Sequence, residues 1–233
     1  MLQFLNIWWP AFFTLGTIGI CCFIDPPRAN QWPPPLDLSG ETAKRFLTSP
    51  WLLVVLIPMM IGLVWIKYFA QKNKLSAMEQ GHMVWWMVNG FWFHTGCDIF
   101  TGLFMKMPVL TELYAHMSPA HRNPSFHDSR AVLDAGYALE LVAEAPLAFI
   151  VLFMYWRRDP ATHLVEIFAA SVQASGTIMY YMPALVAGEA HCWLSYLDRS
   201  CGAVWVIFPI IILLRHVAAT RPKKAKSNGK KKA

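Results

Sequence analysis

Long apolar runs separated by short polar stretches dominate this chain. A helix needs about 20 predominantly apolar residues to cross the hydrocarbon core of a bilayer. The runs therefore predict membrane-spanning helices over 51–70, 84–107, 131–156, 162–183 and 200–217. A further apolar run occupies 2–24, and we expect a retained N-terminal helix there because MLQFLN lacks the basic residues of a signal peptide.

Polar segments lie between these runs and predict loops. The proline-rich segment 25–50 is expected to be an extended loop at the membrane interface, and 108–130 a polar connector. The predicted fold class is all-α, an integral membrane helical bundle of five core helices with an extra N-terminal hydrophobic helix. The predicted domains are 1–50, which holds that helix and its loop, 51–217, the membrane domain, and 218–233, a basic tail.

The composition also favours a membrane protein, since 56% of the residues are hydrophobic and only 15% are charged. A soluble domain would be roughly a quarter charged. Lys72, Lys74, Arg157 and Arg158 fall on the same side of the membrane as the C-terminal tail if all five runs span it. Because short cytosolic loops carry an excess of Lys and Arg, this side is predicted to be cytosolic.

The C-terminal segment RPKKAKSNGKKKA supplies most of the net charge of +6. We expect it to be solvated and to lie near anionic membrane lipid. The basic residues form no patch within the folded domain, so nucleic acid is not an expected partner. The last four residues, KKKA, resemble a dilysine retrieval signal. That resemblance implies a multi-pass protein of the endoplasmic-reticulum membrane.

Ionisable side chains inside the apolar runs are the candidates for chemistry, because such groups are costly within a bilayer. His94 and Asp98 are four residues apart and share one helix face, and the same holds for Glu140 and Glu144. A buried carboxyl group without a charged partner favours its protonated form, which can donate a proton. The two pairs predict a buried acid–base site, with a structural hydrogen-bond network between helices as the alternative. Asp134 lies in the first turn of its helix, where it could simply stabilise the helix N-terminus.

Aromatic rings close to these residues could stabilise a cation in a dry site. Trp92 is the candidate, whereas Trp85 and Trp86 fit an interfacial belt equally well. A proton donor, a proton acceptor and a cation-tolerant wall together suit protonation of an olefin followed by loss of a different proton.

Metal and redox chemistry have little support in the sequence, and we expect neither a metal nor a cofactor. His116, His121 and His127 crowd one loop, but their spacing is irregular and no HExxH motif is present. The five cysteines form no CxxC pair. Cys192 and Cys201 flank one polar loop and could pair in an oxidising lumen, with buried thiols as the alternative.

Five motifs follow one another along the chain: FHTGCDIFTG over 93–102, HDSR over 127–130, LDAGYALELVAEAP over 133–146, SVQASGTIMYYM over 171–182 and GAVWVIFP over 202–209. Together they resemble the emopamil-binding protein family of the EXPERA superfamily, over about residues 51–217. The resemblance implies a five-helix membrane bundle around a sterol-sized cavity. It also implies the reaction of the sterol Δ8–Δ7 isomerases, which protonate a ring double bond and remove a proton elsewhere through a carbocation.

The same resemblance implies roles for individual residues. His94 falls on the family histidine, Asp98 on the glutamate four residues later, and Glu140 on the catalytic glutamate of the third core helix. Glu144 is the alternative for that catalytic acid. The implied substrate-binding residues are Trp92, Asp134, Gln173, Thr177, Tyr180 and Trp205, while Asp128, Ser129 and Arg130 match a DSR motif and Gly176 a motif of the fourth helix.

The chain departs from the family pattern in the region of the expected cavity. Asp98 is one methylene shorter than glutamate, and the spacing from Glu140 to Pro146 is shorter than in the sterol isomerases. Thr177 stands where the family often has aspartate, and Gly202 where an asparagine near the reacting centre is usual. Another polycyclic terpenoid is therefore an alternative to a sterol as the substrate.

The resulting hypothesis is an endoplasmic-reticulum isomerase that shifts a carbon–carbon double bond in a sterol or related terpenoid. A terpenoid cyclase or rearrangement enzyme on the same fold is one alternative, and a non-catalytic sterol- or lipid-binding protein is another. The expected partners are the substrate and membrane lipid, and a homodimer is left open.

Overall fold

The computed structural model describes residue 8 and residues 39–107, 110–111, 127–187 and 196–220. All regular structure in these residues is helical, which confirms the predicted fold class. The predicted N-terminal helix over 2–24 lies, except for residue 8, outside the described residues, as do the histidine-rich part of the connector, Cys192 and the basic tail. The elements are α2 (Gly40–Leu47), α3 (Pro50–Asn73), α4 (Ala77–Val88), η1 (Asn89–Leu103), α7 (His127–Leu139), η2 (Glu140–Glu144), α8 (Ala145–Arg157), α9 (Thr162–Ala187) and α10 (Tyr196–Thr220).

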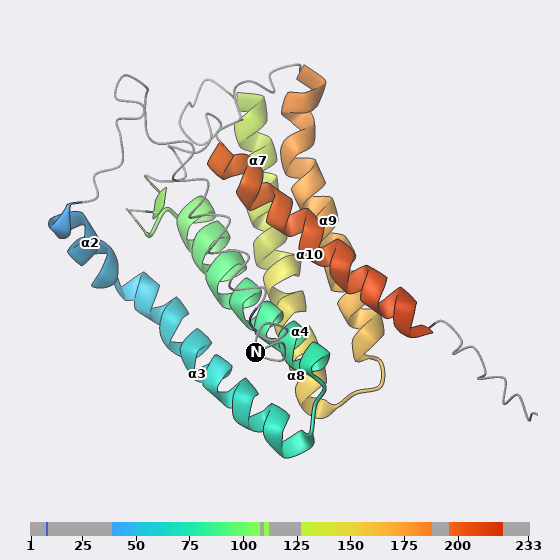
Figure 1. Ribbon diagram of the computed structural model, residues 1–233. Helices are drawn as coiled ribbons and strands as arrows, with labels where there is room; N and C mark the ends of the chain where they lie inside the picture. The colour runs from blue at the N-terminus through green and yellow to red at the C-terminus, as the bar shows by residue number, and fades with distance from the viewer. Residues whose placement is uncertain (1–7, 9–38, 108–109, 112–126, 188–195, 221–233) are drawn as a thin grey trace, which may run out of the picture.

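The five core helices alternate in direction. Figure 1 shows α3 running towards the lower end of the view, α4 and η1 returning, α7, η2 and α8 descending as one continuous helix, and α9 rising beside it. Helix α10 crosses in front of this layer and packs mainly on α9. The turn between α3 and α4, the turn between α8 and α9 and the C-terminal end of α10 thus lie towards the same end, as the alternation predicted.

The predicted extended loop over 25–50 is wrong for Gly40–Leu47, which forms α2. The prolines between 26 and 35 precede this segment, so no helix breaker interrupts it. Glu41 lies in its first turn, and Lys44 and Arg45 lie in its last turn. These charges complement the helix dipole and stabilise the short helix.

Helix α4 begins earlier than the predicted boundary at residue 84, and a capping box explains its start. The amide of Glu79 donates to Oγ of Ser76 (3.2 Å), and the amide of Ser76 donates to Oε2 of Glu79 (2.8 Å). Two amides at the helix start that have no partner within the helix thus each gain a hydrogen bond. The predicted boundary is late because the first residues of the helix, AMEQGHM, are more polar than the apolar run that follows them.

Three helices within the described residues are long and apolar enough to cross a membrane: Pro50–Asn73, Leu133–Arg157 and Gly202–Ala219. The chain is therefore a multi-pass membrane protein. The spans predicted over 84–107 and 162–183 do not meet the same criterion and stay predictions. The first is divided between an α-helix and a π-helix, and the second carries Glu166 and Gln173.

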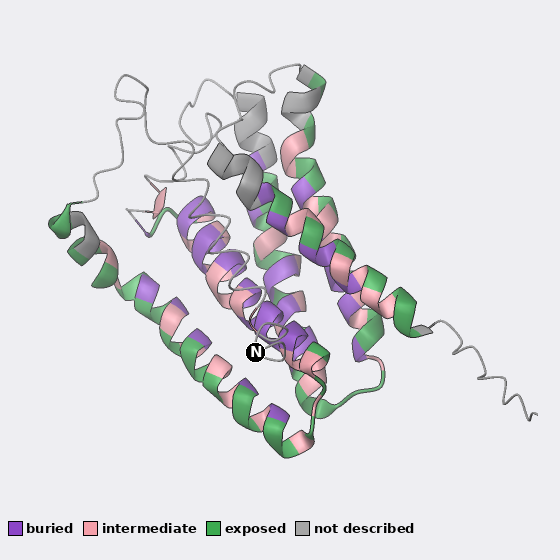
Figure 2. Cartoon of the chain, in the orientation of Figure 1, coloured by how far each residue is buried: buried purple, intermediate pink, exposed green. Residues whose placement is uncertain are grey.

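The outer faces of the bundle are apolar. Figure 2 shows that most residues of α3 are exposed or partly exposed, whereas α4 and the start of η1 are largely buried. Large exposed side chains of α3 include Val54, Ile57 and Ile61. A soluble protein rarely exposes so extended an apolar surface, so this face fits contact with lipid.

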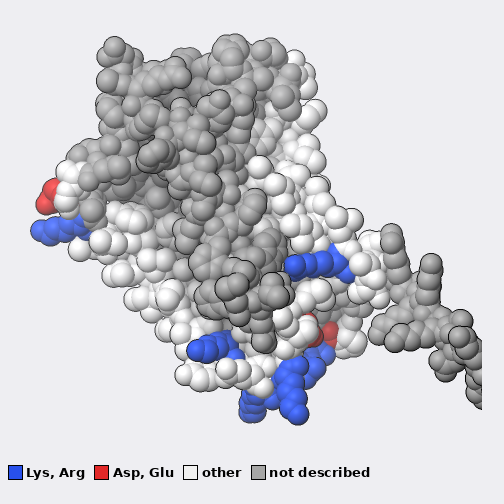
Figure 3. Space-filling model, viewed as in Figure 1, with Lys and Arg blue, Asp and Glu red and all other residues white. Residues whose placement is uncertain are grey.

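Charged residues gather at one end of the bundle. Lys72 lies in the last turn of α3 and Lys74 follows that helix, while Arg157 ends α8 and Arg158 follows it; all four are exposed. Figure 3 shows Lys and Arg side chains gathered at the lower end of the molecule, with further charged side chains at the left edge, where α2 lies. We call this lower end the basic end. Its placement in the cytosol stays a prediction.

Candidate functional site

Both predicted acid–base pairs lie in π-helical backbone. His94 and Asp98 belong to η1 (Asn89–Leu103), and Glu140 and Glu144 are the first and last residues of η2 (Glu140–Glu144). A π-helix is rare in proteins and usually appears as a single turn at a functional site. The sequence predicted the shared faces of the two pairs, but not this backbone.

Hydrogen bonds five residues apart hold the π-helical register. The amide of Phe104 donates to the carbonyl of Ile99 (2.9 Å) at the end of η1. The hydroxyl of Thr95 donates to the carbonyl of Gly90 (2.7 Å), five positions earlier. Thr101 repeats this contact with Gly96 (2.9 Å). The threonine hydroxyls thus supply extra partners for carbonyl groups inside the helix, which stabilises the wider turn.

The imidazole of His94 lies beside two carboxyl groups. Its Nδ1 is in direct contact with Oε2 of Glu140 and lies 3.8 Å from Oε2 of Glu144. Asp98 completes the cluster, because single ligand atoms of His94, Asp98 and Glu140 all lie within 4.8 Å of one another. His94 and Glu144 are buried, and the other two are partly buried. An imidazole in contact with a carboxyl group can exchange a proton with it, which is what acid–base chemistry requires.

Gly176 of α9 makes room for Glu144. A side chain at position 176 would place its Cβ against Oε1 of Glu144. That oxygen has no hydrogen-bond partner within the described chain, and neither has Nε2 of His94. The cluster therefore presents buried polar atoms that are available to a bound molecule.

Aromatic rings from three elements, α4, η1 and α10, pack against one another in the bundle. The ring of Trp205 lies 4.3 Å from that of Phe93 and 5.6 Å from that of Trp85, measured between centroids. Trp85 and Trp86 are each only 1% exposed, which excludes a place in an interfacial belt. Trp92 is partly buried at the edge of the core. Trp85 is thus a buried aromatic neighbour of Trp205 that the sequence did not single out.

The other predicted substrate-binding residues fall into different surroundings. Gln173 and Thr177 are buried one turn apart on α9, and the hydroxyl of Thr177 donates to the carbonyl of Gln173 (3.1 Å). Tyr180 is partly buried, with its ring 4.8 Å from that of Tyr181. Asp134 is exposed. The side chains of Asp128, Ser129 and Arg130 lie outside the described part of the structure.

A family model described as EXPERA (EXPanded EBP superfamily) matches residues 107–216. Residues 107–216 are an EXPERA domain. The EXPERA domain supplies Glu140, Glu144 and the tryptophan at 205, whereas His94 and Asp98 precede it in the chain. Comparison with curated proteins and with solved structures gave no match.

Packing within the EXPERA domain explains why glycine is accommodated at position 202, where the family resemblance predicts asparagine. The ring and hydroxyl of Tyr181 occupy the space that a Cβ at Gly202 would take. Gly202 is buried in α10, directly against this tyrosine of α9. Tyr181 therefore fills the space that a side chain at position 202 would need.

Alanine at position 202 is expected to destabilise the protein by about 1–3 kcal/mol, because it overpacks the contact with Tyr181. The thermal unfolding temperature of the purified protein in detergent measures this effect. Gly136→Ala is the matched control, since nothing lies within 4 Å of a Cβ there. Combining Gly202→Ala with Tyr181→Leu should restore part of the loss. Equal stability of Gly202→Ala and the wild type would contradict the contact.

A second polar cluster surrounds Glu166 nearer the basic end. Oε1 of this fully buried carboxylate accepts a hydrogen bond from Nε1 of Trp86 (2.6 Å). Oε2 accepts from the hydroxyl of Tyr155 (2.7 Å) and lies 2.7 Å from Nε2 of His216. Nδ1 of His82 lies 3.0 Å from Oε1. We call these five residues the Glu166 cluster; they connect α4, α8, α9 and α10, and the sequence did not predict their contacts.

Within the described residues, two groups of side chains have ligand atoms close enough to hold a metal ion: His82, Glu166 and His216, and His94, Asp98 and Glu140. The first group fits a metal poorly. A guanidinium nitrogen of Arg215 lies 3.2 Å from Nε2 of His82. Arginine can only donate, so Nε2 accepts and Nδ1 carries the proton that points at Glu166. His82 therefore presents a hydrogen rather than a lone pair to Glu166.

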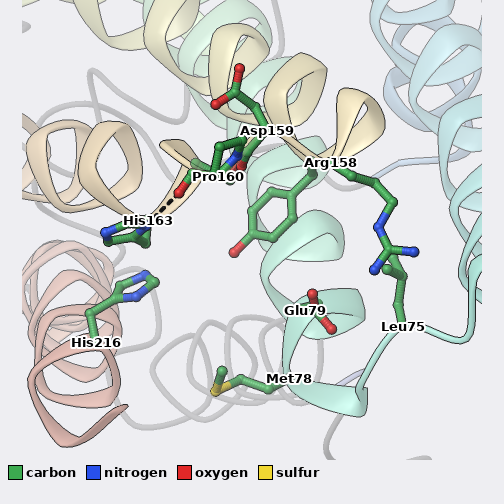
Figure 4. Close-up of a pocket in the computed structure, with 10 residues that line it drawn as sticks. Leu75, Met78, Glu79, Arg158, Asp159, Pro160, His163 and His216 are labelled. Atoms are coloured by element: carbon green, nitrogen blue, oxygen red, sulfur yellow. Dashed lines mark hydrogen bonds between the residues drawn. The ribbon is translucent and has the colours of Figure 1, made fainter. Parts of the chain in front are cut away.

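A pocket of about 250 Å³ opens beside the Glu166 cluster at the basic end. Figure 4 shows His163 and His216 on one side of it and Glu79 and Arg158 on another, with His163 bonded to the carbonyl of Pro160. Charges of both signs line it, and it lies away from His94. The pocket thus offers no continuous apolar surface for a sterol-like ligand.

Proposed function

We propose that the chain is an endoplasmic-reticulum membrane isomerase that shifts a carbon–carbon double bond in a sterol or related polycyclic terpenoid. The EXPERA family includes sterol isomerases, and its members bind sterol-like ligands. The observation that carries the proposal is the contact of His94 with Glu140, beside Glu144, in a buried part of a membrane helix bundle.

In the proposed mechanism, Glu140 donates a proton to one carbon of the double bond. An aromatic ring such as that of Trp205 stabilises the resulting carbocation in the dry site. His94, assisted by Asp98, then removes a proton from a neighbouring carbon, and the double bond re-forms one position away. One proton is gained and one is lost, so the substrate is isomerised without an oxidant or reductant.

Deuterium uptake tests this proposal. Microsomes from cells that express the chain are incubated in heavy water with sterols that carry a ring double bond. The expected product is the shifted isomer with one deuterium on a ring carbon, which mass spectrometry and NMR locate. Microsomes from cells without the chain are the control.

The other outcomes separate the competing functions. Tight sterol binding with no label in any product would overturn the proposal in favour of a non-catalytic binding protein. Label in a product with a rearranged ring skeleton would instead identify a carbocation cyclase or rearrangement enzyme. A shifted double bond without any label would exclude protonation by an exchangeable carboxyl group.

A further inference from the structure

Three polar side chains at or between the two clusters are buried without a hydrogen-bond partner among the described residues. Asn89 is fully buried, Gln173 is 2% exposed and Trp85 is 1% exposed. Both amide atoms of Asn89, both amide atoms of Gln173 and Nε1 of Trp85 have no partner within the described chain. Buried polar groups in native proteins are nearly always paired, and an unpaired one costs free energy. So many unpaired atoms in one bundle indicate that a bound molecule completes them.

One boundary of the layer that holds these residues is the Glu166 cluster. There, Trp86 of α4 donates to Glu166 of α9 over 2.6 Å, which fixes the two helices at the same height. Asn89 follows Trp86 by three residues, and Gln173 follows Glu166 by seven. Both helices run away from the basic end, so both amides lie on the side of this contact that faces His94.

The other boundary is the acid–base cluster. Glu144 lies 3.8 Å from His94 of η1, and its Oε1 also fills the space beside Gly176 of α9. Asn89 precedes His94 by five residues, one turn of a π-helix, and Gln173 precedes Gly176 by three. The two amides therefore lie between the same pair of contacts, on α9 and on the helix that carries His94.

Trp85 lies at the boundary of this layer, one residue before Trp86. It precedes Asn89 by four residues and so lies on the same face of its helix. Its ring packs against Trp205, whose other neighbour is Phe93. A flat apolar ring system bound against these aromatic rings would bring a polar substituent within reach of Nε1 of Trp85 and the amide of Asn89.

The unpaired atoms favour a hydroxyl group over other oxygen substituents. The two amides and the indole offer N–H donors, but the amides also offer two carbonyl oxygens that need a donor. A hydroxyl group has one hydrogen to donate and lone pairs to accept with. A ketone only accepts, and a hydrocarbon does neither. Of these three, only the hydroxyl group can pair with both the N–H groups and the carbonyl oxygens.

We propose that Asn89 and Gln173, with Nε1 of Trp85, bind a hydroxyl group of the substrate and so hold its ring system with the double bond at His94 and Glu140. The substrate is then a hydroxylated polycycle whose hydroxyl end points towards the basic end of the bundle. The reacting bond lies about one helical turn, ~5 Å, further along the bundle axis. The identity of that bond rests on the proposed function, whereas the hydroxyl subsite does not.

Binding of three matched ligands to the purified full chain in lipid nanodiscs tests this assignment. The ligands are a sterol with a ring double bond, the ketone and the deoxy compound with the same ring system. The wild type should bind the alcohol about tenfold more tightly than the deoxy compound, as one hydrogen-bonded pair implies. The ketone should fall between them. Equal binding of the alcohol and the deoxy compound would overturn the proposal.

Two variants test whether these amides cause the preference for the alcohol. Asn89→Leu and Gln173→Met keep the approximate size of each side chain and should each reduce the preference to less than about threefold, with the deoxy compound bound as before. Both should also raise the unfolding temperature of the ligand-free protein, since they remove unpaired buried amides. Asn73→Leu is the control, because that amide bonds to the carbonyl of Phe69 within its own helix; it should keep the preference.

The outcomes of this experiment and of the heavy-water experiment are distinct. An alcohol preference that both variants retain would overturn the subsite even if isomerisation is observed. Loss of the preference in both variants, without any turnover by the wild type, would support the subsite and reject the isomerase. A fall in the unfolding temperature of the ligand-free variants would indicate a structural role of the amides instead.

Discussion

Substitution of Glu140 by glutamine is expected to lower the rate of double-bond isomerisation by about 10²–10⁴-fold, the usual contribution of a general acid. Glutamine keeps the size of the side chain and its position against His94, but it has no carboxyl proton to donate. The rate is measured as labelled product formed in heavy water by microsomes that contain equal amounts of the chain. Sterol binding by the variant should stay close to that of the wild type.

Glu144→Gln is the matched comparison for this variant. Glu144 lies in the same π-helical turn and is also directed at His94, but at 3.8 Å rather than in contact. We therefore expect it to lose far less activity than Glu140→Gln. The reverse order would assign proton donation to Glu144 and overturn the mechanism given for Glu140.

Alanine at position 166 is expected to destabilise the protein by about 3–5 kcal/mol, because it removes the common partner of a buried ionic network. Trp86, Tyr155, His82 and His216 would each lose a hydrogen-bond partner at once. A loss of this size corresponds to a fall of roughly 10 °C in the unfolding temperature of a chain of this length. The measurement is thermal unfolding of purified protein in detergent.

Glu41→Ala is the control for charge removal, since Glu41 is exposed on α2. It should leave the unfolding temperature within about 2 °C of the wild type, as surface substitutions usually do. An unfolding temperature of Glu166→Ala that matches this control would show that the Glu166 cluster contributes little to stability.

The five core helices could be predicted because membrane spans and the turns between them differ sharply in hydrophobicity. The predicted run over 51–70 corresponds to α3, and the run over 162–183 corresponds to α9. Boundaries were less accurate where hydrogen bonds, rather than apolar residues, define the helix end. The capping box at Ser76 and the short helix Gly40–Leu47 are the examples.

The convergence of His94 with Glu140 and Glu144 could be anticipated from spacing alone. Each pair places two ionisable side chains on one helix face. Such side chains need polar partners inside a membrane, and the other pair is the nearest source of them. The catalytic roles of these residues stay predictions. What spacing could not reveal was the π-helical backbone, because its hydrogen-bond register depends on packing and on side chains such as Thr95.

The Glu166 cluster was missed for a different reason. Its members come from four helices, and each residue alone resembles an ordinary polar side chain near a membrane interface. One signal was present in the sequence: Glu166 is a charged residue in an otherwise apolar stretch, LVEIFAA. Such a residue requires a partner. The unpaired amide of Asn89 carried no comparable signal, because only burial distinguishes it from a surface asparagine.

The π-helical form of η1 means that chain length, as well as residue identity, encodes the acid–base site. In an α-helix each residue turns the next by 100° about the axis. Deleting one residue between Asn89 and His94 would swing every later side chain of the segment round by a comparable angle, and His94 and Asp98 would no longer face Glu140 and Glu144 of η2. The deletion would keep all the chemical groups of the site and still dismantle it. Relatives of this chain that conserve each polar residue but differ by a single insertion or deletion in 89–103 should therefore differ in activity.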